Sequence, residues 1–153
     1  TGEYSVIIWE ITPFINKLPV KELQKLRKIS DLSNFIWLKD RDYTYPELIQ
    51  KNNFLKIKPI TIYDHDHLKP FNQLLNDQRA VYFEDYYWAQ SVIEKANLPI
   101  EALRHLSIKE KNYTGFNTNK AKLAKKWDQT LGQLINDGII DNIFIKWTGS
   151  EAP

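Results

Sequence analysis

The sequence contains no cysteine in its 153 residues, which excludes a disulfide framework, a thiolate nucleophile and a cysteine-based zinc site. It also lacks a long hydrophobic run, because the longest, at residues 6–9, is far shorter than the roughly 20 residues of a membrane-spanning helix. Charge of one sign is not in excess, since 21 basic and 19 acidic residues leave a net charge of +2. We therefore expect no membrane insertion and no nucleic-acid partner.

The hydrophobic fraction of 42% and the single chain of moderate length are sufficient for one domain with a packed core. Short apolar runs alternate with amphipathic segments, and no internal repeat or flexible linker interrupts them. The pattern predicts extended segments at residues 4–9, 11–16, 35–38, 57–63, 80–83, 102–108 and 113–116. It predicts helices at residues 20–27, 30–34, 45–49, 68–75, 85–96, 123–135 and 140–147.

Strands that alternate with helices in this way need crossover connections and form a mostly parallel sheet. The sequence therefore predicts an α/β fold, a three-layer sandwich in which helices flank both faces of the sheet. Pro13 indicates that its strand lies at an edge or crosses between parts of the fold. Gly138 is placed to end the long helix, and Trp127 and Trp147 are expected in the core.

The C-terminal third carries a more specific combination of motifs. It has residues 113–116, a helix with Leu123, Trp127 and Leu131 on one face, the turn at 137–140 and a closing helix ending at Trp147. This ending resembles that of bacterial extracellular solute-binding proteins of family three. Residues 28–38 and 79–85 are similar to the second lobe of that family, so that the resemblance covers about residues 28–147.

The resemblance implies a type II periplasmic binding fold, with residues 18–110 as the second lobe. Residues 1–17 and 111–153 are then hinge strands and C-terminal helices of the first lobe, whose N-terminal half has no counterpart in this sequence. The resemblance also implies periplasmic or secreted localisation, with the export signal removed. The implied function is non-enzymatic binding of a small polar solute, either amino acid-like or a small carboxylate or amine, for an ABC-type transporter or a sensor. No cofactor is implied.

Asp85 lies where a predicted strand ends and a helix begins, which is where open α/β sheets bind their ligands. By the resemblance, its carboxylate accepts a hydrogen bond from a ligand ammonium group. The alternative is that Asp85 caps its own helix and complements the helix dipole.

The segment after the strand at 35–38 departs from the family, which has a Gly-Thr pair whose backbone N–H groups hold the ligand carboxylate. Here residues 39–44 carry acids and no glycine, which counts against a simple amino-acid ligand. We expect Arg41 to replace the pair, because a guanidinium binds a carboxylate through two parallel hydrogen bonds. A surface ion pair with Asp40 or Asp42 is the alternative. The predicted ligand-binding residues are Leu38, Arg41, Asp42, Tyr43, Thr44, Tyr63, Asp64 and Asp85.

Two further motifs, the histidines at 65 and 67 and the aromatic residues 86–88, each have more than one possible role. His65 and His67 share one side of an extended segment and supply half of a metal site, or they are solvated beside a helix cap. The aromatic residues 86–88 either stack on a ligand or divide between the ligand site and the core, because three consecutive residues of a helix do not share one face. We predict no metal site.

Two alternatives to solute capture also stay open. One is an enzyme on the same scaffold, dehydratase-like, with Glu84 and Asp85 as acid and base, although neighbours on a strand point to opposite faces. The other is a lobe fragment that forms a homodimer or pairs with another chain to cover its apolar surface. The expected partners are thus a small-molecule solute and transporter or sensor subunits.

Overall fold

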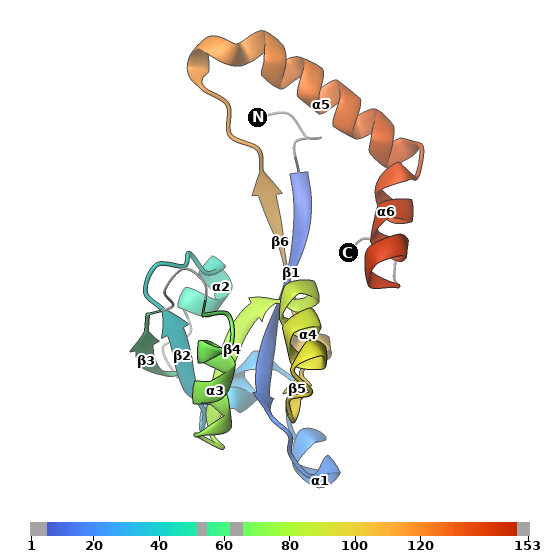
Figure 1. Cartoon of the computed structure of the whole chain (residues 1–153). Coiled ribbons are helices and arrows are strands. Elements are labelled where there is room, and N and C mark those ends of the chain that lie inside the picture. The colour runs from blue at the N-terminus through green and yellow to red at the C-terminus, as the bar shows by residue number, and fades with distance from the viewer. Residues whose placement is uncertain (1–5, 52–54, 62–65, 150–153) are drawn as a thin grey trace. The chain divides into compact units, whose positions relative to one another are not determined.

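The computed structural model describes residues 6–51, 55–61 and 66–149. The described residues divide into a larger unit within Glu10–Ile108 and a smaller one made from residues 6–9 and 109–149. In chain order (Figure 1), the elements are β1 (Val6–Asn16), α1 (Val20–Leu23), the 3₁₀ helix η1 (Ile29–Leu32), β2 (Ile36–Asp40), α2 (Glu47–Gln50), β3 (Lys56–Ile60), α3 (Lys69–Leu75), β4 (Ala80–Asp85), α4 (Tyr86–Lys95), β5 (Ile100–Ala102), η2 (Arg104–Leu106), β6 (Ile108–Tyr113), η3 (Thr118–Lys120), α5 (Ala121–Asn136) and α6 (Ile139–Thr148).

The strands of the described residues form one sheet in the order β3-β2-β4-β1-β5, and β6 also pairs with β1. β2 is parallel to both β3 and β4, whereas β1 is antiparallel to both β4 and β5. Strands β2 to β5 therefore run in one direction and β1 is reversed between them. The expected α/β fold with a mostly parallel sheet is confirmed, and the carboxyl ends of β2, β3, β4 and β5 meet at the same edge.

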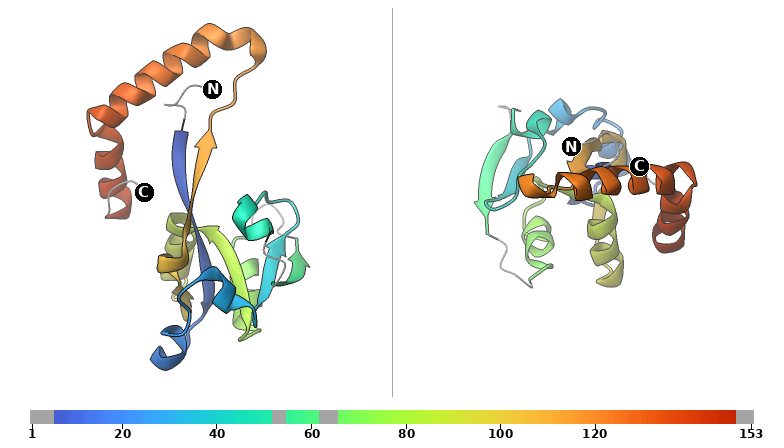
Figure 2. Two further views of the ribbon diagram at one scale, coloured as in Figure 1. Left: turned by 180° about the vertical axis from the view of Figure 1, so that it is seen from behind. Right: turned by 90° about the horizontal axis from the view of Figure 1, so that it is seen from above.

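Each face of this sheet has its own hydrophobic core, because successive side chains of a strand point to opposite faces. In β4, Ala80 and Tyr82 pack in the core that α3 and α4 cover, while Val81 and Phe83 pack with α2, η1 and η2. The right-hand view of Figure 2 shows α3 and α4 on the same side of the sheet. The predicted three-layer arrangement is confirmed by these two cores.

Pro13 lies inside β1 at the point where pairing with β5 ends. β5 pairs with β1 only through Phe14 to Asn16, and the Pro13 carbonyl accepts a hydrogen bond from the N–H of Leu103 at 2.9 Å, just beyond β5. The N–H that proline lacks is therefore not needed for the ladder. Of the two predicted positions, the crossing strand is observed and the edge strand is not, because β1 lies between β4 and β5 and continues from one unit into the other.

The prediction of an extended segment at 102–108 is wrong. β5 ends at Ala102, and the chain then forms the 3₁₀ helix η2, in which the Leu106 N–H donates to the Leu103 carbonyl at 2.8 Å. Leu103 and Leu106 are both buried. A spacing of three residues suits one face of a 3₁₀ turn, whereas alternate residues of a strand share a face. This turn places Arg104 at the carboxyl end of β5.

In the smaller unit, α5 and α6 are joined at Gly138, whose φ of 69° lies in the left-handed region that glycine adopts without a steric penalty. The predicted end of the long helix is confirmed. Trp127 and Trp147 are 42% and 76% exposed, so their predicted core positions are wrong. Within the described ranges, every helix is too short or too polar to cross a bilayer.

Candidate functional site

The carboxyl edge of the sheet gathers polar side chains from four strands of the larger unit. β2 ends at Asp40, β4 ends at Glu84 and Asp85, and Arg104 follows β5. β1 runs the other way, so its residue Glu10 lies at the same edge, next to the pair formed by Ile11 and Asp85. Open α/β sheets bind ligands at this edge, where loops and helix starts replace the paired strands.

Asp85 caps the helix that it precedes. Its Oδ1 accepts a hydrogen bond from the Trp88 N–H at 3.0 Å, which is the N-cap contact proposed as one of its two roles. Burial raises the pKa of the Asp85 carboxyl, and backbone N–H groups of Trp88 and Tyr87 act in the opposite direction. The side chain remains half-buried rather than covered, so that capping does not close it to a ligand.

Glu84 is held beside Asp85 by two hydrogen bonds. Tyr82 donates its hydroxyl to Oε2 at 2.8 Å, and the Asp85 N–H donates to Oε1 at 2.8 Å. Burial raises the pKa of the Glu84 carboxyl, and the charges of Asp85 and Asp40 raise it further. The edge therefore holds carboxylates that repel one another, which is an arrangement that a cationic group stabilises.

The loop after β2 turns its tyrosines toward these carboxylates. The Tyr45 hydroxyl accepts a hydrogen bond from the Asp40 N–H at 3.1 Å, and the Tyr43 and Tyr45 rings lie 4.8 Å apart in an edge-to-face arrangement. Burial raises the pKa of both phenols, and the negative charge of Glu84 raises each further. Tyr43, which is half-buried, thus belongs to the group of side chains around Glu84 and Asp85.

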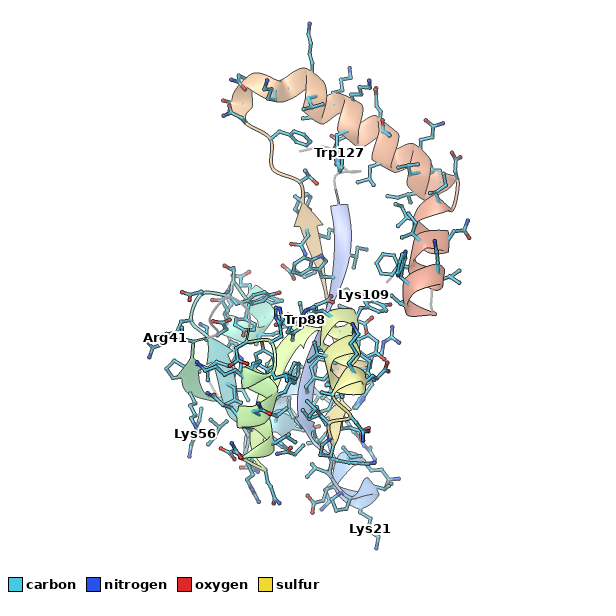
Figure 3. The ribbon with its side chains drawn as sticks, viewed as in Figure 1. Lys21, Arg41, Lys56, Trp88, Lys109 and Trp127 are labelled. Atoms are coloured by element: carbon cyan, nitrogen blue, oxygen red, sulfur yellow. The ribbon has the colours of Figure 1, made fainter. Side chains whose placement is uncertain are left out.

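Arg41 is placed differently from the expectation. Its backbone N–H donates to the Ile60 carbonyl of β3 at 3.0 Å, and its side chain is exposed. In Figure 3 this side chain projects outward from the strand side of the larger unit, away from Trp88. Asp42 and Thr44 are also exposed, and the Asp42 N–H donates to the Asp40 carboxylate at 3.1 Å.

The other predicted ligand-binding residues lie either in the core or outside the described part of the chain. Leu38 is fully buried among Phe14, Ile60 and Phe71, so its side chain packs in the core and is not exposed at the carboxyl edge where it was expected to contact a ligand. The reason is the alternation along β2, which turns Leu38 into the core under α3. Tyr63, Asp64 and His65 lie outside the described residues.

Sequence reasoning missed an ion pair at this edge. Arg104 donates from Nε to Glu10 Oε1 at 2.8 Å and from Nη2 to Glu10 Oε2 at 3.1 Å. Its guanidinium carbon lies 4.1 Å from the centre of the Tyr86 ring, and Nη2 also donates to the Tyr87 hydroxyl at 3.2 Å. Hydrogen bonding to Glu10 raises the pKa of Arg104. A signal was present, since Glu10 is the one charged residue in the apolar sequence of β1.

The aromatic residues after Asp85 have different contacts, although Tyr86 and Trp88 both pack against the core that α3 and α4 cover. Tyr86 and Tyr87 meet the Arg104 guanidinium, whereas Trp88 packs on Phe71 with ring centres 6.0 Å apart. His67 is exposed and its ring lies 5.6 Å from that of Trp88. Over the described part of the chain, no three histidine, cysteine or acidic residues come close enough together to bind a metal ion.

Two open hollows of the larger unit lie at the other end of the strands. They have volumes of about 510 and 560 Å³ and share Leu18, Glu22 and Gln78 among their lining residues. Their linings mix apolar, amide and oppositely charged groups and contain none of the predicted site residues. The carboxyl edge is therefore identified by its chemistry and topology and not by the size of a hollow.

Solved structures share this fold. A structure described for glutathione import via GshT and the cystine ABC importer TcyBC of Streptococcus mutans has 15% identity and a TM-score of 0.70, over 97% of this chain and 63% of that one. A substrate-binding protein of an ABC uptake transporter from Streptococcus pneumoniae, with bound histidine, has 15% identity and a TM-score of 0.64, over 97% and 61%. The L-cystine solute receptor of Neisseria gonorrhoeae has 12% identity and a TM-score of 0.63, over 97% and 59%.

This chain has the type II periplasmic binding fold. The similarity confirms the resemblance at the level of fold, since the identities lie well below 25%. No protein-family model and no curated protein matches the sequence. The chain spans only 59% to 63% of the length of these three solved chains. The unit Glu10–Ile108 encloses most of the predicted second lobe at 18–110.

Proposed function

We propose that this chain captures a small polar solute that carries an ammonium group, and releases it chemically unchanged to a bacterial ABC-type transporter or to a sensor. The proposal includes an extracellular or periplasmic location. It is supported by the type II periplasmic binding fold, and by the similar structures, which include a histidine-bound substrate-binding protein and an L-cystine receptor.

One observation carries the proposal. Asp85 lies half-buried at the carboxyl end of β4, and the carboxylate of Glu84 is next to it. The phenol of Tyr43 is close enough for the negative charges of Glu84 and Asp85 to raise its pKa. An ammonium group placed among these oxygens would form charge-assisted hydrogen bonds and relieve the repulsion between the two carboxylates. The aromatic rings of Tyr43 and Tyr86 provide apolar surface for the rest of a small solute.

The test is isothermal titration of the chain with L-arginine, L-histidine, L-cystine and putrescine, and with succinate as a ligand without an ammonium group. We expect binding of at least one ammonium ligand with a dissociation constant of about 1 mM or tighter, and none of succinate. Asp85→Asn should weaken that binding by at least about tenfold, because one charge-assisted hydrogen bond becomes neutral.

Asp77→Asn is the matched control. Asp77 also accepts a hydrogen bond from a nearby backbone N–H, that of Arg79 at 3.1 Å, but it lies before β4, at the opposite end of that strand from Asp85. Equal binding by wild type and Asp85→Asn, or no heat with any ammonium ligand, would contradict solute capture at this edge.

The same samples distinguish capture from catalysis. After prolonged incubation, mass spectrometry should recover the bound solute with unchanged mass and in unchanged amount. Conversion that depends on Glu84 would instead favour the enzyme alternative, in which a carboxyl whose pKa is raised by burial acts as a proton donor.

A further inference from the structure

An apolar row on α5 and α6 is exposed to solvent in the smaller unit. Its members recur every four residues, a spacing that keeps side chains on one side of each helix. They are between 40% and 76% exposed and comprise Leu123, Trp127, Ile135, Ile139, Ile143 and Trp147. Leu131, in the middle of the row, is only 9% exposed and is therefore covered within the chain. The exposed surface thus consists of two patches, one on each side of Leu131.

The first patch, with Leu123 and Trp127, is basic. Residues 117–127 contain four lysines and no acid: Lys120, Lys122, Lys125 and Lys126. Lys126 lies one helical turn beyond Leu123, at the border of the apolar row. The Phe116 ring packs on Trp127 with ring centres 6.2 Å apart, which holds the indole in place while 42% of this residue stays exposed. We call this surface the basic patch.

The second patch, with Ile135, Ile139 and Ile143, is acidic. Residues 128–145 contain three acids and no basic residue: Asp128, Asp137 and Asp141. Asp137 directly follows α5 and is exposed, as is Lys126. About three helical turns separate the two, so they lie on the same flank of α5. The row ends at Trp147, where the Lys146 ammonium lies 5.3 Å from the ring centre. We call the surface of the three isoleucines the acidic patch.

The two patches are complementary but cannot meet within one chain. Leu123 and Ile135 are on the same rigid helix and lie about 18 Å apart along its axis. Two copies of α5 in antiparallel orientation, related by a twofold axis near the middle of the helix, place the basic patch of each copy on the acidic patch of the other. Lys126 then lies opposite Asp137 twice in the pair. Both contacts form together, so the arrangement closes on itself and does not extend into a filament.

The distribution of charge favours a second copy over a membrane surface. Anionic lipids attract the lysines of the basic patch, but they repel Asp137 beside the isoleucines of the acidic patch. The exposed parts of the row offer on the order of 500 Å² of apolar surface per copy. Weak and transient protein interfaces bury less than about 1,200 Å² in total, counted over both partners. The row is therefore large enough for a dimer of moderate affinity.

We propose that two copies of this chain form a closed antiparallel dimer through α5 and α6, in which the basic patch of each copy covers the acidic patch of the other. The proposal goes beyond solute capture and does not depend on it, because all of these residues belong to the smaller unit and none lies at the carboxyl edge of the sheet.

The experiment is sedimentation equilibrium of the chain between about 1 and 300 μM. We expect the mass to rise from 18.1 kDa toward twice that value, with a dissociation constant of about 1–100 μM. Leu123→Glu should weaken the dimer at least about tenfold, because it places a charge in the apolar contact. Leu48→Glu is the matched control, since Leu48 is a 61% exposed leucine on α2 of the larger unit.

A charge exchange tests the antiparallel register. Lys126→Glu and Asp137→Lys should each weaken the dimer by about threefold or more, because each brings like charges together twice. The double variant should restore the wild-type affinity within about twofold, since the two signs are only exchanged. Both positions are exposed, and circular dichroism of each variant checks that the helices are retained.

Each result has a definite consequence. A monomer over the whole concentration range overturns the proposal, as does a dimer that Leu123→Glu leaves unchanged. Failure of the double charge variant to recover affinity overturns the antiparallel register, and masses beyond the dimer overturn the closed arrangement. Binding of a monomeric chain to phosphatidylserine vesicles, lost in Leu123→Glu and kept in Leu48→Glu, would assign the row to a membrane surface instead.

Discussion

Replacement of Arg104 by methionine should destabilise the larger unit to an extent that depends strongly on pH. With Arg104 in place the Glu10 side chain is 7% exposed, and its carboxylate accepts two hydrogen bonds, at 2.8 and 3.1 Å, which the variant lacks. Breaking a buried ion pair by removing one partner typically costs about 3–5 kcal/mol. The value for this pair should be smaller, because Arg104 is 44% exposed and part of its interaction is already screened by water.

Protonation of the unpaired carboxylate sets an upper limit on the loss in free energy of unfolding. A carboxyl of ordinary acidity takes up a proton at pH 7 for about 3.7 kcal/mol, and at pH 5 for about 1 kcal/mol. If the unpaired, charged carboxylate of Glu10 destabilises the native state by more than this free energy of protonation, the carboxylate binds a proton in the native state instead. We therefore expect Arg104→Met to lower the free energy of unfolding by about 2–3 kcal/mol at pH 7 and by less than about 1 kcal/mol at pH 5.

Urea unfolding followed by far-ultraviolet circular dichroism, at both pH values, measures these differences. The double variant Glu10→Gln with Arg104→Met should recover most of the loss at pH 7, because no buried charge remains. An equal loss at pH 5 and pH 7 would refute the reasoning, since it would show that lost packing on Tyr86, and not an unpaired Glu10, sets the cost.

Substitutions at three other residues test separate parts of the structure. Phe14→Ala should lower the free energy of unfolding by about 3–5 kcal/mol in urea titrations, because this side chain is fully buried against Phe71 and leaves a cavity. Asp85→Asn should lower the free energy of unfolding by less than about 0.5 kcal/mol, since asparagine caps helices as well as aspartate does. Asp85→Ala should lower it by about 1 kcal/mol. A larger loss in the asparagine variant would show that this substitution weakens solute binding by destabilising the fold. For Glu84, burial raises the pKa in the native state, so the native protein holds the proton to higher pH than the unfolded chain and loses stability as pH rises through this range. Glu84→Gln lacks this loss, and its stability relative to wild type should therefore rise between pH 4 and pH 7; a flat difference would contradict a raised pKa.

Local patterns in the sequence were sufficient for the layers and for the helix starts. The apolar run at residues 80–83 predicted the strand, and the cap was one of the two roles left open for Asp85, because an acid after a buried strand and before a helix satisfies free N–H groups of the first turn. Gly138 was equally predictable, since the end of a helix favours a residue with positive φ. Such features depend on neighbours within a few residues, which a single sequence displays directly.

Features that depend on distant parts of the chain were missed. The prediction for Leu38 followed its place near a strand end, but burial depends on which face of the sheet α3 covers. Trp127 and Trp147 lie on amphipathic helices, and the period of a helix predicts an apolar face without supplying a surface to cover it. Both remain exposed in the part of the chain that the structure describes.

The contact between Glu10 and Arg104 depends on topology in the same way. Arg41 was favoured because it follows a strand end in the sequence, whereas Glu10 and Arg104 are 94 residues apart and have no local motif in common. They meet because β1 runs antiparallel between β4 and β5. That single reversal places a β1 carboxylate beside the turn after β5 and beside the start of α4. The ion pair between Glu10 and Arg104 is thus a consequence of the direction of β1 between its two neighbouring strands.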